Sequence, residues 1–281
     1  MRETPFEQIK EELRLKIPDD LLEKIPDKWE KIGNILIIVL DEKLTSFKEL
    51  ISENYSKILN CKTVLNDVGG ITGEYRTPNV EILYGTNDTE TIHKENGVIF
   101  KLDPQKVMFS SGNMDERIRI GKIPNSEEVV VDLFAGIGYF TLPIAVHSRP
   151  KKIIAVEKNP DAFNFLSQNI VLNKVSRIVE PIKGDNRKVA PKNVADRVIL
   201  GYLGDTYQFL PIAIEALNNY TGVIHYNDKF PEDQVPEKPL NVVKIIAERY
   251  DRMCSLLDYK CVKTYAPGIS HYVFDIEVGC K

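Results

Sequence analysis

The chain has 281 residues, of which 43% are apolar, and it carries 37 Lys and Arg residues against 41 Asp and Glu residues. These values are typical of a soluble globular protein and exclude a disordered chain, a collagen and a fibrous repeat. The length suits one large domain or two modest ones, which can bury a sizeable core without disulfides or a structural metal.

The cysteines predict a reduced, cytoplasmic protein without a metal. Cys61, Cys254, Cys261 and Cys280 form no CxxC pair and no zinc-binding spacing. The most apolar early run, residues 35–40, is far too short to cross a bilayer, and the charged N-terminus lacks the core of a signal peptide. We therefore expect no membrane partner and no metal partner, while the oligomeric state is left open.

The first part of the chain predicts a small α+β domain, which we place at residues 1–102. Residues 8–25 and 44–60 carry apolar side chains at helical spacing, and residues 35–40 form an apolar run typical of a buried strand. In residues 61–102 short β-like runs alternate with clusters of Gly, Asn and Asp.

The second part, residues 103–281, alternates strand and helix signals. The predicted strands are residues 129–134, 153–156, 178–182, 197–200 and 222–226, and the predicted helices are residues 140–147, 160–173, 207–218 and 240–257. Two further β-like segments, residues 259–265 and 272–278, would close the sheet. This alternation predicts an α/β fold with a mostly parallel sheet covered by helices on both faces.

The charge is unevenly distributed along the chain. The net charge of −4 does not by itself indicate a nucleic-acid partner. Residues 141–200, however, hold 11 basic and 5 acidic side chains, which leaves the rest of the chain strongly acidic. A local basic face binds phosphate even on an acidic protein, although a solvated helical surface explains the same charges.

A glycine-rich turn follows the first predicted strand of the second domain. It reads Asp132-Leu133-Phe134-Ala135-Gly136-Ile137-Gly138. Gly136 and Gly138 permit a tight turn and the close approach of a ligand to the backbone. The turn lacks the full dinucleotide pattern GxGxxG, so by itself it is equally a plain strand-to-helix connection.

Acidic residues follow the next two strands. Glu157 lies 25 residues after Asp132, where a carboxylate accepts both ribose hydroxyls of a nucleoside, and Asp185-Asn186 lies where an adenine amino group would be bound. Each acid alone would serve equally as a helix cap. Because ligands bind at the carboxyl ends of the strands in open α/β sheets, the joint placement favours an adenosine-containing cofactor without a pyrophosphate clamp.

The order of these segments resembles the S-adenosylmethionine-dependent class I methyltransferases over roughly residues 125–280. The similar motifs are DLFAGIGYF from Asp132, AVEKNP from Ala155 and GDN from Gly184. The resemblance implies a Rossmann-like sheet and S-adenosylmethionine as co-substrate.

The segments upstream resemble a narrower family, which modifies the purine 3′ of the tRNA anticodon. They are residues 25–34, 71–76, 91–97 and 108–117. One branch of that family methylates N1 of guanosine 37. The other, the archaeal-type wybutosine-synthesis aminocarboxypropyltransferases, moves the 3-amino-3-carboxypropyl group of S-adenosylmethionine to a tricyclic guanosine derivative. The resemblance implies tRNA as partner and a first domain that positions it.

Two departures favour the aminocarboxypropyl branch. Gly201 lies where sequences that resemble the methylating branch read Asn-Leu-Pro. A glycine has no side chain to hold a target nitrogen. Ser111-Gly112-Asn113 stands where that branch resembles Pro-Arg-Leu. The resemblance then implies transfer to carbon 7 of 4-demethylwyosine at position 37 with release of methylthioadenosine. Guanosine 37 N1-methylation is the alternative, and a non-catalytic nucleotide-binding protein is a third.

The resemblance also implies the site residues. The cofactor-binding set is Ser110, Arg117, Asp132, Gly136, Glu157, Asp185 and Asn186. Arg117 would pair with the methionine carboxylate, unless it forms a salt bridge within the protein, with Ser110 and Asn113 adding hydrogen bonds.

No catalytic residue is identified by the sequence. The candidates are Arg117, Asn113 and Tyr202, and Tyr202 would stack on the target base or pack in the core. We find no general base, since His147, His225 and His271 are isolated and His93 has no evident role. The expected contacts to tRNA phosphates are Lys151, Lys152, Lys174, Arg187 and Lys188.

Overall fold

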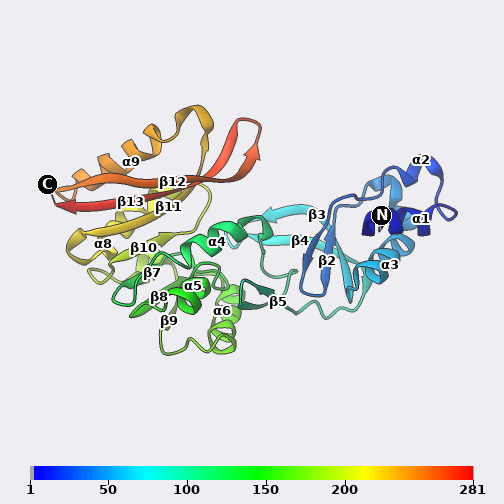
Figure 1. Cartoon of the computed structure of the whole chain (residues 1–281), viewed down its shortest axis with the longest axis horizontal. Helices are drawn as coiled ribbons and strands as arrows, with labels where there is room; N and C mark the ends of the chain where they lie inside the picture. The colour runs from blue at the N-terminus through cyan, green and yellow to red at the C-terminus, as the bar shows by residue number, and fades with distance from the viewer. Residues whose placement is uncertain (1–2, 281) are drawn as a thin grey trace. The chain divides into compact units, whose positions relative to one another are not determined.

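The computed structural model describes residues 3–280, which form two compact units (Figure 1). The first unit contains the chain up to Lys94 together with Phe100–Ser111, and the second contains Glu95–Ile99 and the chain from Gly112 onward. The boundary that we predicted at residues 102/103 therefore differs from the division in the structure. No helix in the described part of the chain is both long and apolar enough to cross a membrane.

The first unit packs helices against one four-stranded sheet. Its helices are α1 (Pro5–Leu13), α2 (Asp19–Leu22) and α3 (Lys48–Leu59), and its strands β1 (Glu30–Ile32), β2 (Ile35–Ile38), β3 (Thr63–Thr72) and β4 (Thr77–Gly85) lie in that order. A capping box begins α1, in which Thr4 accepts from the backbone of Glu7 and the Glu7 side chain accepts from the backbone of Thr4. The apolar faces of α1 and α3 bury Ile9, Leu13 and Tyr55 against the sheet.

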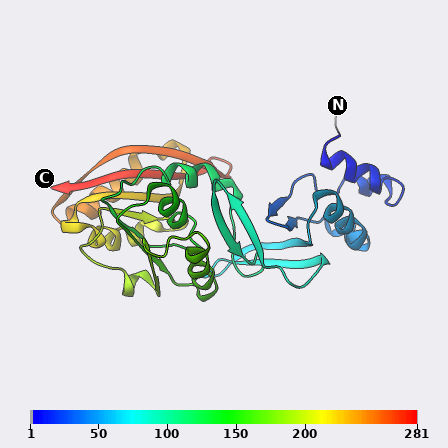
Figure 2. The same cartoon turned by 60° about the horizontal axis from the view of Figure 1, so that its bottom comes forward.

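A hairpin, β5 (Thr91–Glu95) and β6 (Val98–Leu102), explains the position of the boundary (teal in Figure 2). Its tip belongs to the second unit because three contacts hold it there. Arg117 pairs with Glu95, and the side chain of Asn173 both accepts from the backbone N–H of Ile99 (2.9 Å) and donates to its carbonyl (2.7 Å). The third contact joins Asn96 to His147.

The second unit is built on a seven-stranded sheet with the order β12-β13-β11-β10-β7-β8-β9. The strands are β7 (Val129–Asp132), β8 (Lys152–Glu157), β9 (Val179–Lys183), β10 (Arg197–Leu200), β11 (Gly222–Pro231), β12 (Arg252–Ala266) and β13 (Ile269–Cys280). The helices are α4 (Met114–Ile120), α5 (Thr141–Pro143), α6 (Pro160–Leu172), α7 (Asn186–Val189), α8 (Leu210–Ala216) and α9 (Glu237–Glu248). Strands β7 to β11 are parallel to one another, and β13 is antiparallel between β11 and β12. The predicted α/β fold with a Rossmann-like sheet is confirmed.

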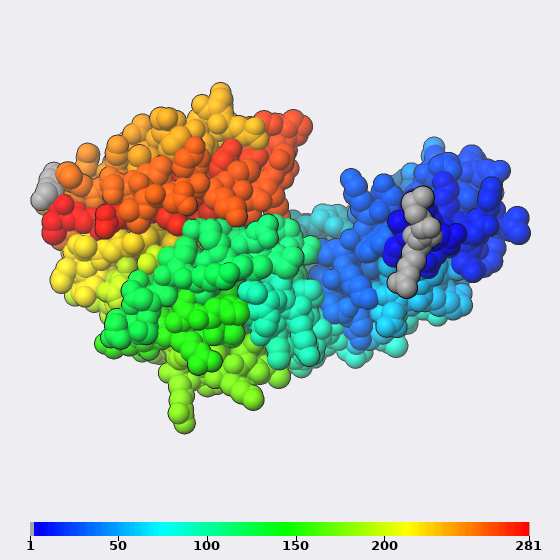
Figure 3. Space-filling view, viewed as in Figure 1, coloured from blue at the N-terminus to red at the C-terminus, as the bar shows by residue number. Residues whose placement is uncertain are grey.

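One predicted element is wrong. We expected a helix over residues 240–257, but α9 ends at Glu248 and strand β12 begins at Arg252. Asp251 has φ +55° and turns the chain between the two elements. Because β12 is the edge strand, most of its side chains are exposed, and its segment runs along the surface (orange in Figure 3).

Candidate functional site

The parallel strands bring their carboxyl ends, and the residues that follow them, to one edge of the sheet. Asp132, the last residue of β7, is fully buried and accepts hydrogen bonds from the Thr141 hydroxyl (2.7 Å) and the Phe134 backbone N–H (3.2 Å). Burial raises the pKa of Asp132 to about 6. Asp132 therefore fixes the start of the glycine turn through the backbone of Phe134.

Replacing Asp132 with asparagine should stabilise the protein near neutral pH. The folded protein holds the Asp132 proton more tightly than the unfolded chain, whose carboxyl has the ordinary pKa of 3.8. Its contribution to stability is therefore complete below that value and is lost as the pH rises through about 6. The gain for Asp132→Asn should grow across this window to roughly 3 kcal/mol. Urea unfolding across the window measures it, and a gain that does not change with pH would contradict the raised pKa.

Glu157, at the end of β8, ties the glycine turn to the next strand. Its Oε2 accepts from the Gly136 N–H (2.7 Å) and its Oε1 from the Asn159 N–H (2.6 Å). Gly136 has φ +57°, and a Cβ there would lie 2.4 Å from the Tyr139 ring, so only glycine fits. The backbone of Lys158 also hydrogen-bonds this carboxylate, and its roughly four acceptor positions leave capacity for a ribose hydroxyl.

Asp185 and Asn186, which follow β9, have different roles in the structure. Asp185 caps α7 and is bound by Arg187 (2.6 and 2.9 Å) and Lys158 (3.1 Å). The hydrogen bond from Arg187 holds the pKa of Asp185 below its usual range. Asn186 donates through Nδ2 to the Leu133 carbonyl (2.9 Å), and its buried Oδ1 has no hydrogen-bond partner in residues 3–280. Since buried acceptors are nearly always paired, this oxygen fits a donor such as an adenine amino group.

The segment after β10 carries aromatic packing in place of a polar side chain. A Cβ on Gly201 would lie 2.8 Å from the ring of Phe140, so a side chain there would displace that ring. Tyr202 stacks on Phe134 with centroids 5.0 Å apart and meets Phe209 edge-on at 5.9 Å. Of the two roles predicted for Tyr202, the structure shows the packing, and a contact with the base stays a prediction.

Asp228, which we did not predict, fixes this loop. Its carboxylate accepts from the backbone N–H groups of Gly204 (3.2 Å) and Thr206 (3.0 Å) and from the Tyr226 hydroxyl (3.3 Å). The sequence signal is weak, because the predicted strand ends at Tyr226 whereas β11 continues to Pro231.

Arg117 lies in α4 with a partner from the hairpin tip. Its Nε donates to Oε1 of Glu95 and one terminal nitrogen donates to Oε2, both at 2.6 Å. Both side chains are almost fully buried, with 2% and 6% exposed. The alternative of an internal salt bridge is thus what the structure contains, with Glu95 as the partner, and binding of a ligand carboxylate by Arg117 stays a prediction.

The other predicted site residues of segment 108–117 lie in different units. Ser110 belongs to the first unit, and its assignment to the cofactor stays a prediction. Asn113, at the start of α4, has a buried Oδ1 without a hydrogen-bond partner in the described part of the chain.

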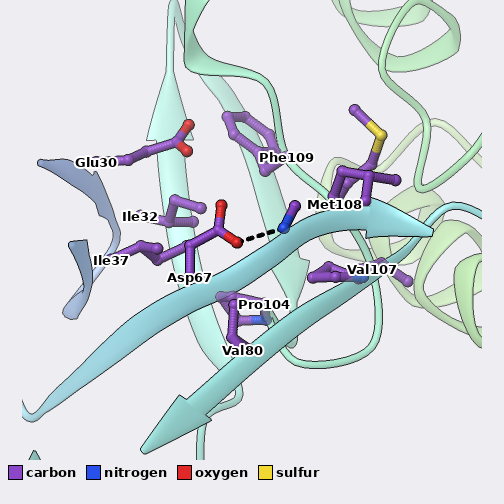
Figure 4. A pocket seen from close by; sticks show the side chains of 12 residues that line it. Glu30, Ile32, Ile37, Asp67, Val80, Pro104, Val107, Met108 and Phe109 are labelled. Atoms are coloured by element: carbon purple, nitrogen blue, oxygen red, sulfur yellow. Dashed lines mark hydrogen bonds between the residues drawn. The ribbon is translucent and has the colours of Figure 1, made fainter. Parts of the chain in front are cut away.

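A pocket in the first unit is lined in part by the first residues of segment 108–117. It has a volume of about 70 Å³ and is lined mostly by apolar side chains, with Met108 and Phe109 among them (Figure 4). The two carboxylates at this pocket already bind backbone N–H groups. Glu30 accepts from Ser111 (3.1 Å) and Asp67 accepts from Gly70 (2.6 Å). Glu30 therefore anchors the backbone at Ser111.

The predicted phosphate contacts are all on the surface. They are Lys151, Lys152, Lys174, Arg187 and Lys188. Two of them have acidic partners, Glu180 for Lys152 (2.5 Å) and Asp185 for Arg187. His225, which the sequence left isolated, is buried between Asp275 and Arg197. No group of three or more His, Cys, Asp or Glu side chains able to hold a metal occurs in residues 3–280.

Comparison with known proteins identifies the family. Residues 91–257 match the TRM5/TYW2 methyltransferase domain, and residues 9–89 match the TYW2 N-terminal domain. The chain belongs to the TRM5/TYW2 family.

Members of the TRM5/TYW2 family match over nearly the full chain. A Pyrococcus horikoshii protein named tRNA(Phe) (4-demethylwyosine(37)-C(7)) aminocarboxypropyltransferase is 41% identical over 96% of both chains. A Methanocaldococcus jannaschii protein of the same name is 46% identical over 88% of this chain and 96% of its own. The crystal structure of P. horikoshii TYW2 in complex with MeSAdo covers 98% of this chain and 100% of its own at 38% identity, with a TM-score of 0.88.

The methylating members of the family are similar at lower identity. The Pyrococcus abyssi tRNA (guanine(37)-N(1))-methyltransferase Trm5b is 36% identical over 93% of this chain and 78% of its own. The predicted relationship to both branches is therefore confirmed, and the similarity is greater to the aminocarboxypropyl branch.

Proposed function

We propose that this protein transfers the 3-amino-3-carboxypropyl group of S-adenosylmethionine to carbon 7 of 4-demethylwyosine at position 37 of tRNA. The observation that carries the proposal is Gly201. The methylating branch resembles Asn-Leu-Pro here, whereas in this structure even a Cβ would lie 2.8 Å from the Phe140 ring. A side chain that holds a target nitrogen would therefore have to displace the Phe140 ring.

S-adenosylmethionine is the co-substrate in this proposal. Glu157 holds the ribose hydroxyls, Asn186 Oδ1 accepts from the adenine amino group, and Asp132, Gly136 and Asp185 shape the walls between them. Ser110 and Arg117 are assigned to the methionine arm by resemblance. When bound, S-adenosylmethionine supplies a γ-carbon whose bond to sulfur breaks as carbon 7 bonds to it, so that methylthioadenosine leaves and carbon 7 loses its proton.

The residues around the site hold the reacting groups in position. A carbon nucleophile on an electron-rich tricycle needs alignment more than it needs a strong base, and alignment is supplied by holding the reacting atoms in place. Asp228 fixes the loop that carries Tyr202, and the stacked Phe134 supports the Tyr202 ring from one side.

The tRNA is bound, in this proposal, with its anticodon-loop purine at the site. The exposed basic side chains of residues 141–200 contact phosphates, and the first unit positions the substrate. Recognition of a splayed loop base depends on shape and stacking more than on a groove pattern. The four unpaired cysteines are in keeping with the cytoplasmic location that we propose.

Labelled S-adenosylmethionine tests the transfer. The acceptor is tRNA that carries 4-demethylwyosine, with tRNA that carries unmodified guanosine 37 in parallel. We expect label from the carboxyl carbon in the RNA, together with free methylthioadenosine. Label from the methyl carbon in guanosine 37 would establish the methylating alternative. Incorporation of neither label, with intact binding of S-adenosylmethionine, would favour a non-catalytic binding protein.

A further inference from the structure

A row of three side chains crosses the sheet beyond the loop that carries Tyr202. In the register of the strands Lys229 of β11 lies opposite His271 of β13, and His271 lies opposite Lys263 of β12. Opposite residues of antiparallel strands project to the same face, so the three side chains are neighbours. His271 is buried, and Lys229 lies over the Tyr265 ring with its Nζ 4.2 Å from the ring centroid.

The Lys263 side chain extends from this row to Gly112, in the segment that precedes α4. A Cβ built on Gly112 would lie 3.6 Å from Cδ and 3.8 Å from Nζ of Lys263. Both are ordinary van der Waals distances, so the end of the Lys263 side chain packs beside Gly112. The ammonium group of Lys263 therefore lies near Gly112, the residue before Asn113.

Two buried acceptors lie near this point, one on Asn113, which follows Gly112, and one on His271, which lies opposite Lys263 in the strand register. Asn113 Oδ1 and His271 Nδ1 have no hydrogen-bond partner within residues 3–280. His271 Nε2 lies 3.0 Å from Asn227 Oδ1, so Nε2 carries the proton and Nδ1 is the acceptor. Burial and the charge of Lys263 lower the pKa of His271 to about 4, which keeps the ring neutral. Unpaired buried acceptors destabilise the protein until a ligand or water supplies a donor.

We propose that Lys263 and Asn113 bind the amino-acid end of S-adenosylmethionine, with the carboxylate on Lys263 Nζ and the ammonium group on Asn113 Oδ1. His271 Nδ1 is a second acceptor for the ammonium group. A cation beside two neutral acceptors matches the two charges of a zwitterion. The inference rests on the proposed function and adds Lys263 to the residues assigned to the amino-acid arm.

The role fits aminocarboxypropyl transfer. The amino-acid arm is the group that moves, so the protein has to hold both of its charged ends while its γ-carbon faces the base. Methyl transfer makes no such demand on this arm.

Calorimetric dissociation constants of Lys263→Met test the inference, with Lys229→Met as the matched control from the same row. The probes are S-adenosylmethionine, its decarboxylated analogue and methylthioadenosine, which lacks the whole arm. Lys263→Met should weaken binding of S-adenosylmethionine by about 10- to 100-fold, the range for a lost charged hydrogen bond. It should leave the affinities for the decarboxylated analogue and for methylthioadenosine unchanged, and Lys229→Met should change none of the three.

Three results would overturn the inference. Lys263→Met could weaken S-adenosylmethionine no more than Lys229→Met does, or it could weaken all three probes equally, which would indicate a displaced loop. It could instead weaken tRNA binding alone, which would assign Lys263 to an RNA phosphate. Failure of the unaltered protein to bind S-adenosylmethionine and methylthioadenosine is a separate result, because it would refute the proposed function and the inference with it.

Discussion

Arg117→Ala should destabilise the second unit by about 3–5 kcal/mol, the cost of leaving one buried charge without its partner. Both hydrogen bonds of the Arg117–Glu95 pair are 2.6 Å long, and water reaches almost none of either side chain. Removal of the guanidinium strands the Glu95 carboxylate in a site that it cannot leave, because Asn173 holds the hairpin tip at Ile99.

Urea unfolding of Arg117→Ala beside Lys152→Ala measures this effect. Lys152 forms an equally short ion pair with Glu180, but about half of each side chain is exposed, so its loss should change stability by less than about 1 kcal/mol. The double variant Arg117→Met with Glu95→Leu removes both charges and should recover most of the loss, since apolar replacement of a buried pair is often neutral. Equal unfolding midpoints for Arg117→Ala and Lys152→Ala would contradict the assignment.

The same double variant tests the assignment of Arg117 to the cofactor. If the folded double variant binds S-adenosylmethionine as tightly as the unaltered protein, Arg117 acts only through the fold. A loss of affinity for S-adenosylmethionine but not for methylthioadenosine would place Arg117 on the amino-acid arm.

The nucleotide half of the proposed site follows from the sequence, because each parallel strand is a short local segment whose end can be recognised. Asp132 and Glu157 directly follow apolar runs, Asp185 comes three residues after Ile182, and all parallel strands end at the same edge of the sheet. The sequence could not tell which of these side chains reaches a ligand. Asp132 is fully buried, Asp185 is bound by Arg187, and the unpaired acceptor is the neighbouring Asn186.

The other half of the proposed site could not be predicted because it depends on pairing between distant segments. Glu95 meets Arg117 only because a hairpin tip packs on the second unit. Lys263 and His271 come together through the register of β12 and β13, and the start of β12 was mistaken for helix. A register shift of one residue moves a side chain to the other face of a sheet, and nothing in the local sequence fixes that shift.

Glu157→Ala should weaken the binding of S-adenosylmethionine by about 100-fold, as expected for two hydrogen bonds to a charged acceptor. The variant also removes the acceptor for the backbone N–H groups of Gly136 and Asn159, so a loosened glycine turn would weaken binding without any contact to the ribose. Glu180→Ala, which removes an exposed carboxylate from β9, is the matched control and should leave the affinity unchanged.

Altering the ligand together with the protein distinguishes a lost ribose contact from a loosened glycine turn. Methylthioadenosine and its 2′-deoxy analogue differ by one hydroxyl, whose loss should cost the unaltered protein about tenfold in affinity. If Glu157 binds that hydroxyl, the analogue and the parent should bind equally to Glu157→Ala, because the partner is already gone. If Glu157 only fixes the turn, the tenfold difference should persist in the variant. Persistence would remove Glu157 from the ribose contacts and leave it as the residue that positions Gly136.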